Sequence, residues 1–167
     1  MAEITLKGKP IHTNGNLPNI GEKAPSFILV DGDLSDRSLD EFRGKKKLLS
    51  IVPSLDTSVC ALSTKKFNEE VAKHPEITVI VISADLPFAQ KRFCGMENIK
   101  NILPLSMMRS KDFAKDYGVL IQDGPLKGLS ARAILILDEE NRVIYKELVK
   151  EIAEEPNYEK ALHAMLG

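Results

Sequence analysis

The chain has 167 residues, of which 43% are hydrophobic, enough for a domain with a sizeable core. Its 23 lysines and arginines nearly balance its 24 aspartates and glutamates, and a formal net charge of -1 argues against nucleic-acid binding. No apolar stretch approaches the roughly 18 to 20 residues that span a bilayer, and the N-terminus lacks the basic and apolar segments of a signal peptide. We therefore expect a cytoplasmic protein that does not bind membranes.

The first 17 residues have the pattern of an appendage to the main sheet. Residues 4–6 and 10–13 alternate like two short strands, and Gly8-Lys9 separates them. We expect a β-hairpin within residues 1–17, attached to a single domain that covers residues 1–167.

Five further apolar segments predict the strands of a central sheet, and several are continuously apolar, as in strands covered on both faces. They cover residues 27–30, 48–52, 77–82, 131–137 and 143–148. Glu139-Glu140-Asn141, between the last two, predicts an antiparallel hairpin. Lys45-Lys46-Lys47, before the second, predicts a solvated turn.

Helical patterns lie between these strands. Ser38 begins a capping-box spacing, and Gly95 and Gly118 each follow a helical pattern, as is typical just past a helix end. The other predicted helices cover residues 60–71, 86–93, 112–117 and 158–166. Strands that alternate with helices predict an α/β protein with a mixed central sheet flanked by helices, the outline of a thioredoxin-like fold.

The chain has only two cysteines, too few for a disulfide-stapled secreted scaffold. Cys60 falls in the first turn of a predicted helix, where unpaired amides favour an anion and hence the nucleophilic thiolate. Thr57 lies at or near the N-cap, and Pro53 ends the preceding strand and can shield a pocket. The alternatives are a small buried hydrophobe for Cys60 and purely structural roles for Thr57 and Pro53.

Two further residues are candidates for the same site. Arg132 lies between apolar segments, where a buried arginine needs an anionic partner such as a thiolate, unless it reaches solvent from an edge strand. Cys94 lies at the end of the helix predicted over residues 86–93, where it could equally be a packed apolar residue.

The segment from Pro53 to Cys60, P-S-L-D-T-S-V-C, resembles the P-x-x-x-T-x-x-C signature of peroxiredoxins, and the chain is most similar to the bacterial thiol peroxidase subfamily. The likeness covers nearly the whole chain. Its further motifs are F-C at 93–94, D-Y-G-V at 116–119, D-G-P-L at 123–126, A-R-A at 131–133 and E-P-N-Y at 155–158. The resemblance implies that Thr57 and Arg132 position the peroxide and stabilise a Cys60 thiolate, which Pro53 shields.

The resemblance also implies a reaction cycle of the atypical two-cysteine type. The Cys60 thiolate attacks the O–O bond of a hydroperoxide and becomes a sulfenic acid, Cys94 of the same chain condenses with it, and thioredoxin reduces the disulfide. Because both cysteines are assigned to helix ends, we expect local unfolding before the disulfide closes. The resemblance further implies a homodimer that serves antioxidant defence, and we expect Leu55, Val59 and Phe88 to favour alkyl or lipid hydroperoxides.

Other cysteine chemistries fit less well. A thioredoxin-type reductase needs a second cysteine close to Cys60, and a phosphatase needs an arginine where this chain has Lys66. A cysteine protease needs a partnering histidine, whereas His12, His74 and His163 lie in polar or terminal contexts. No metal, haem or nucleotide motif is present, so we expect no cofactor. A redox-regulated binding module or holdase that uses the same disulfide as a switch is the alternative from a different class.

Overall fold

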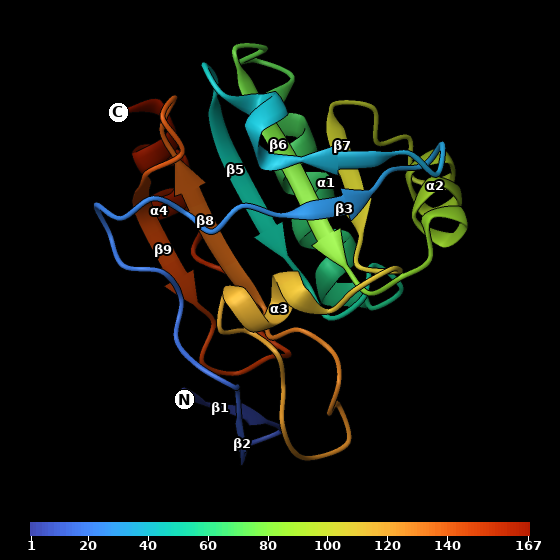
Figure 1. The fold of residues 1–167 in the computed structure, drawn as a ribbon. Coiled ribbons are helices and arrows are strands. Elements are labelled where there is room, and N and C mark those ends of the chain that lie inside the picture. Colours follow the sequence, from blue (N-terminus) through green and yellow to red (C-terminus); the bar gives the residue numbers. More distant parts are fainter.

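The computed structural model describes all 167 residues, which form two sheets, four α-helices and one short 3₁₀ helix. The strands of the larger sheet are β3 (Ile28–Val30), β4 (Asp36–Ser38), β5 (Lys46–Ile51), β6 (Ile77–Ser83), β7 (Ile102–Ser106), β8 (Ala133–Leu137) and β9 (Val143–Leu148). The helices are α1 (Ser58–Val71), α2 (Pro87–Met96), α3 (Asp112–Asp116) and α4 (Tyr158–Leu166). Figure 1 shows the larger sheet, whose strand order is β4-β3-β7-β6-β5-β8-β9.

The larger sheet is mixed, as predicted. Strands β5, β6 and β7 run parallel, whereas β8 is antiparallel to β5 and β9 is antiparallel to β8. Leu48 of β5 lies between Val79 of β6 and Ile136 of β8, and all three side chains are buried. Central strands of this kind are apolar on both faces, so helices must cover both sides of the sheet.

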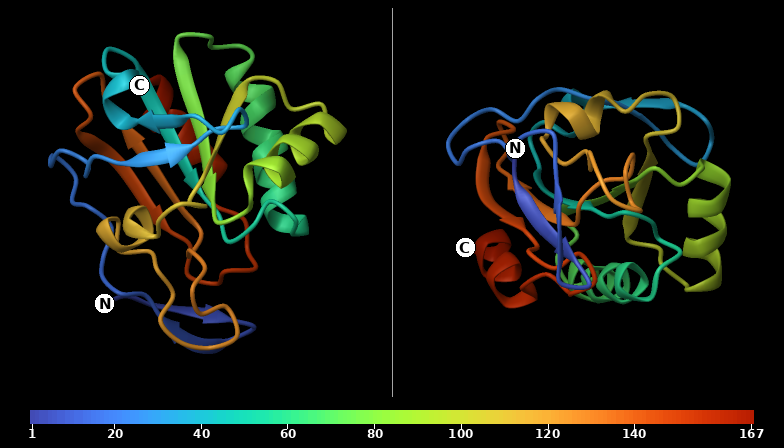
Figure 2. Two further views of the ribbon diagram at one scale, coloured as in Figure 1. Left: turned by 45° about the vertical axis from the view of Figure 1, so that its right-hand side comes forward. Right: turned by 90° about the horizontal axis from the view of Figure 1, so that it is seen from below.

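The helices cover the sheet unequally. Figure 2 shows α1 and α4 side by side on one face, α3 on the opposite face, and α2 at the side of the molecule. Helix α2 packs beside β7. The buried apolar side chains form two clusters, and the smaller one, which contains residues of α1 and α4, also contains Cys60. None of the helices is long and apolar enough to cross a membrane.

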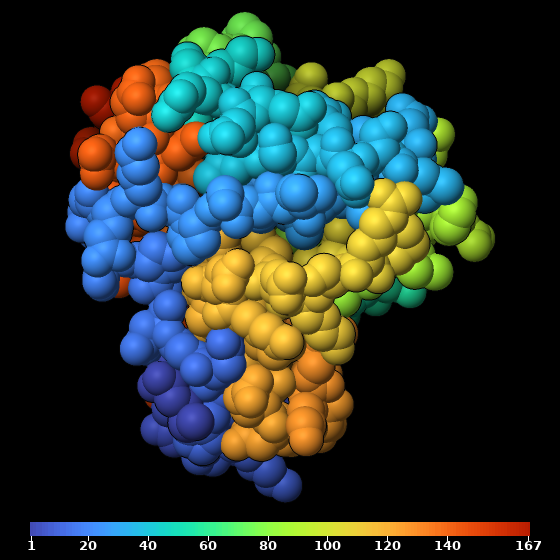
Figure 3. Space-filling view, in the orientation of Figure 1, coloured from blue at the N-terminus to red at the C-terminus, as the bar shows by residue number.

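The N-terminal hairpin is confirmed. Its antiparallel strands are β1 (Glu3–Leu6) and β2 (Lys9–His12). Ile4 and Ile11 are buried in the larger apolar cluster, and the His12 ring lies 2.7 Å from the Asp123 carboxylate. Figure 3 shows the hairpin packed against the later segment that contains Asp123. The hairpin therefore contributes to the main core.

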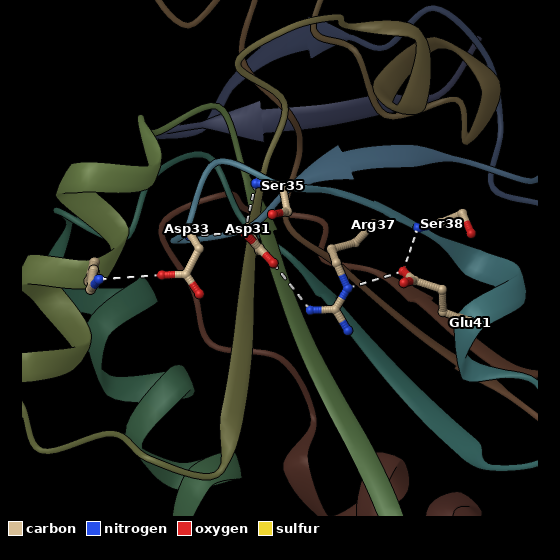
Figure 4. A network of polar contacts seen from close by, with 7 residues as sticks. Asp31, Asp33, Ser35, Arg37, Ser38 and Glu41 are labelled. Atoms are coloured by element: carbon tan, nitrogen blue, oxygen red, sulfur yellow. Dashed lines mark hydrogen bonds and ion pairs between the residues drawn. The ribbon is translucent and has the colours of Figure 1, made fainter.

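Two strands of the larger sheet, β4 and β7, were missing from the sequence prediction. Polar contacts hold the β3–β4 turn: the Asp31 carboxylate accepts hydrogen bonds from the Ser35 N–H and from Arg37, which also donates to Glu41 (Figure 4). Strand β7 contains Pro104, which is atypical of a strand inside a sheet because it lacks an N–H. The apolar pattern of the sequence detects neither a turn held by polar side chains nor a strand that contains proline.

The expected capping box at Ser38 is present, but the helix that it begins is short. The Glu41 carboxylate accepts a hydrogen bond from the Ser38 N–H at 2.9 Å. The segment then forms only a 3₁₀ turn, η1 (Leu39–Phe42), because Arg43 leaves the helical conformation and Gly44 has a φ of 90°.

Two other sequence predictions are wrong. Gly95 does not end a helix, since α2 continues to Met96 and the left-handed residue beyond it is Asn98, with a φ of 56°. Lys47 is not in a solvated turn: it is fully buried in β5, its Nζ donates a hydrogen bond to the Phe42 carbonyl at 3.1 Å, and burial lowers its pKa.

Candidate active site

Cys60 lies in the first turn of a helix, as predicted. Helix α1 begins at Ser58 after the N-cap residue Thr57, so Cys60 is its third residue. Its side chain has no solvent exposure, and its carbonyl accepts a hydrogen bond from the Thr64 hydroxyl at 2.7 Å. The sulfur therefore lies at the positive end of the helix within an apolar cluster.

Arg132 supplies a cation to this buried sulfur. It precedes β8 and is 3% exposed, so the alternative of an edge-strand arginine that reaches solvent is wrong. Its Nη1 lies 2.9 Å from Cys60 Sγ, and its Nε donates a hydrogen bond to the Ile152 carbonyl at 2.9 Å. A guanidinium held in this way favours an anionic sulfur.

Thr57 and Pro53 shape the loop that leads into α1. Thr57 is the N-cap residue, but its hydroxyl makes no capping bond and instead donates to the Ser54 carbonyl at 3.2 Å. Strand β5 ends at Ile51, two residues before Pro53, which is buried. Pro53 cannot extend the strand pairing because it has no N–H.

A pocket of about 570 Å³ lies between the start of α1 and α2. Its lining residues are Leu55, Asp56, Thr57, Ser58, Ala61, Asp85, Ala89, Arg92, Phe93, Met96 and Glu97. Of the three apolar residues expected near a substrate, only Leu55 lines it. Val59 is half-buried elsewhere on α1, and Phe88 of α2 is 63% exposed.

Cys94 lies in the last turn of α2, half-buried against the apolar cluster that contains Cys60. The two thiols are not bonded to one another. Burial raises the pKa of the Cys94 thiol from 9.0 to about 11. The folded helix therefore lowers the fraction of Cys94 that is present as thiolate.

Asp85 is a site residue that the sequence analysis missed. It follows β6, and its carboxylate accepts hydrogen bonds from the Ser54 hydroxyl and the Leu55 N–H at 2.6 and 2.7 Å. The sequence signal is a carboxylate two residues beyond the end of a buried strand, where the strand ends of an α/β sheet converge. The structure has no cluster of three or more histidine, cysteine, aspartate or glutamate side chains that could hold a metal ion.

Comparison with known proteins gives consistent results. The model of the Redoxin family matches residues 19–162. The thiol peroxidases of Mycobacterium tuberculosis and Mycobacterium bovis are 54% identical over 165 residues, which cover 99% of both chains in each comparison.

Solved structures agree with this family. A peroxiredoxin-like protein from Aquifex aeolicus is 43% identical with a TM-score of 0.94, over 99% of this chain and 96% of that one. The thiol peroxidase from Chromobacterium violaceum is 30% identical with a TM-score of 0.90, over 98% and 94% of the two chains. These matches confirm the thioredoxin-like fold with its N-terminal hairpin. The chain belongs to the redoxin family, and within it to the bacterial thiol peroxidases, peroxiredoxin-type enzymes that reduce hydroperoxides with a thiol.

Proposed function

We propose that Cys60 is the peroxidatic cysteine of this thiol peroxidase. The observation that carries the proposal is the 2.9 Å contact between Arg132 Nη1 and Cys60 Sγ inside the core. A buried guanidinium beside the sulfur stabilises the thiolate before reaction and the negative charge that passes to the leaving oxygen during it.

In the first step, the Cys60 thiolate attacks one oxygen of the hydroperoxide. An S–O bond forms, the O–O bond breaks, and the leaving alkoxide or hydroxide departs as alcohol or water after it takes a proton. Cys60 becomes a sulfenic acid. Thr57, whose hydroxyl already donates to the Ser54 carbonyl, is left with acceptor capacity for the O–H of the peroxide. Pro53 limits the access of water to the sulfur.

In the second step, Cys94 attacks the Cys60 sulfenic acid, an S–S bond forms, and water leaves. The raised pKa of the buried Cys94 thiol makes it a poor nucleophile while α2 is folded. We propose that α2 unwinds before the disulfide forms, and that thioredoxin then reduces the intramolecular disulfide by thiol exchange.

The proposal extends to substrate and assembly. Leu55 and the apolar side chains around it in the pocket suit alkyl or lipid hydroperoxides, and Val59 and Phe88 remain candidates for contact with longer substrates. We propose that residues 1–167 act as one domain, because the hairpin contributes to the main core. We also propose a homodimer, and a cytoplasmic location because recycling by a dithiol needs a reducing compartment.

The test is the consumption of cumene hydroperoxide coupled to thioredoxin and its reductase. We expect Cys60→Ser to lose turnover because no thiolate remains to attack the peroxide. Cys94→Ser should consume about one equivalent of peroxide and then fail to recycle through thioredoxin.

Full activity in Cys60→Ser, or no consumption of peroxide by the wild type, would contradict the proposal. No consumption by the wild type would favour the alternative of a redox-switched binding module, because such a protein needs the disulfide but no turnover.

A further inference from the structure

We infer that Asp85 is a positioning residue that holds the peroxidatic loop, residues 53–57, in its reactive conformation; this inference rests on the function proposed for Cys60. Asp85 lies between β6 and α2 and is half-buried. Its carboxylate accepts hydrogen bonds from Ser54 and Leu55 of the loop and from the Ser83 hydroxyl at 2.7 Å. Hydrogen bonds to an ionised carboxylate are stronger than neutral ones, so this contact restrains the loop.

The restraint extends through Ser54 to the start of α1. The Ser54 hydroxyl, which donates to Asp85, also accepts the Asp56 N–H at 3.1 Å. The Ser54 carbonyl accepts the Thr57 hydroxyl, and Thr57 is the N-cap residue of the helix that carries Cys60. A shift of Ser54 would therefore move both the Thr57 hydroxyl and the first turn of α1.

The other side of Asp85 is anchored to the sheet and to α2. The Ser83 hydroxyl accepts a hydrogen bond from Gln90 Nε2 at 3.0 Å, and the same Nε2 donates to the Leu105 carbonyl. The Ser106 hydroxyl donates to the Asp85 carbonyl. The network thus joins the ends of β6 and β7, helix α2 and the peroxidatic loop.

Gln90 makes the network depend on whether α2 is folded, and therefore on the step of the reaction cycle. It lies on α2, in the turn before Cys94, so unwinding of this part of α2 would withdraw Gln90 from Ser83. Asp85 therefore restrains the loop most firmly while α2 is folded, which is the state that meets peroxide. Oxidation of Cys60 should need Asp85, whereas closure of the disulfide, which follows unwinding, should not.

Asp85→Asn tests this inference on the full chain, with limiting cumene hydroperoxide, rapid acid quench and mass spectrometry of alkylated thiols. We expect oxidation of Cys60 to slow by about 10- to 100-fold, because small misplacements of reacting groups have effects of this size, and closure to stay within about twofold of the wild type. Asp138→Asn is the matched control, since the Asp138 carboxylate also accepts hydrogen bonds from a turn, those of the Glu140 and Arg142 N–H groups between β8 and β9. It should leave both steps unchanged.

Ser54→Ala is a second variant that removes one of the three bonds to Asp85 and serves if Asp85→Asn does not fold. We expect it to slow oxidation by about three- to tenfold. Unchanged oxidation in the variants, or a loss of both steps in the same proportion as global destabilisation gives, would overturn the inference. If the wild type and Asp138→Asn also failed to oxidise Cys60, the proposed function itself would fail.

Discussion

Arg132 is held at two points of its guanidinium. Nε donates to the Ile152 carbonyl, and Nη1 lies against Cys60 Sγ, both at 2.9 Å. Because the guanidinium is planar and rigid, the bond to Ile152 determines where Nη1 points. The backbone carbonyl of residue 152 is therefore part of the support for the reactive sulfur, although it makes no contact with it.

The substitution Arg132→Lys separates charge from geometry. Lysine keeps the positive charge, but its single ammonium group cannot hold the Ile152 carbonyl and the sulfur in the same fixed arrangement. We expect the rate constant for oxidation of Cys60 by cumene hydroperoxide to fall by about 10²- to 10³-fold, as when a positioned donor is removed from a developing anion. Initial rates at subsaturating peroxide measure this change.

Arg142→Lys is the matched control, because the Arg142 guanidinium also donates to a backbone carbonyl, that of Gly21, but on the surface. It should oxidise at the wild-type rate. A wild-type rate in Arg132→Lys would mean that charge alone is sufficient, and the role given to the Ile152 carbonyl would be wrong.

The site could be predicted from the sequence where local patterns define it. The position of Cys60 in the first turn of a helix follows from an apolar strand and a helical pattern on either side, and a buried Arg132 between apolar segments needed an anion. Asp85 and the Ile152 carbonyl could not be predicted in this way. Their contacts form only when strand ends and loops distant in the sequence come together.

Helix α2 is weakly anchored. Only two of its residues, Pro87 and Gln90, are buried, whereas Phe88 and Met96 are largely exposed. A segment with few buried apolar contacts opens at low free energy. The helix that carries Cys94 is therefore suited to unwind without unfolding the sheet.

Gly95→Ala should slow the closure of the disulfide. Gly95 lies inside α2, its φ is not positive, and a Cβ at this position would meet no atom within 4 Å. Alanine in place of glycine stabilises such a helix by about 0.5 to 1 kcal/mol, which corresponds to roughly two- to fivefold slower closure if unwinding comes first. Rapid quench of the peroxide-treated protein measures closure.

Oxidation of Cys60 in the same samples is the internal control and should not change.

The pH profile of closure in the wild type gives an independent check. If α2 unwinds first, the Cys94 thiol titrates near its ordinary value and the rate levels off near pH 9. A rate that rises until pH 11, together with unchanged closure in Gly95→Ala, would show that Cys94 reacts from the folded helix.

The strands and helices that could be predicted from the sequence are also those that local patterns define. Strands β5, β6 and β8 were predicted because each is a nearly continuous apolar segment buried on both faces. Strand β4 was missed because the side chains of Asp31 and Arg37, rather than apolar packing, support its turn. The sequence pattern predicts the end of α2 too early because glycine is typical of the position just past a helix end, whereas Gly95 lies inside the helix.

The N-terminal hairpin is connected to the site through the segment that follows β9. The Thr5 N–H of β1 donates to the Lys150 carbonyl, and the Thr5 carbonyl accepts the Ile152 N–H at 2.9 Å. The carbonyl of Ile152 in turn accepts Arg132 Nε. The hairpin therefore holds the segment that orients the arginine beside Cys60.

Glu151 fastens this segment to the hairpin. Hydrogen bonds from the Gly8 N–H, the Ala153 N–H and the Thr5 hydroxyl hold the pKa of its carboxyl below the ordinary value of 4.5. A carboxyl with a lowered folded pKa stabilises the fold fully above its unfolded pKa, and this contribution is lost as the pH falls through the folded pKa.

We therefore expect Glu151→Gln to lower Tm by about 1 to 3 °C at pH 7, with a difference from the wild type that closes as the pH falls through the lowered pKa of Glu151. Oxidation of Cys60 should slow about two- to fivefold, less than in Arg132→Lys, because the Ile152 carbonyl is loosened but not removed.

The control is Glu154→Gln, on the same segment, whose side chain is exposed and should affect neither quantity. A Tm difference of the same size at acid pH would mean that the charge of Glu151 is not what fastens the hairpin. An unchanged oxidation rate would mean that Arg132 keeps its place without the hairpin, since Ile152 would then be held by its own burial in the core.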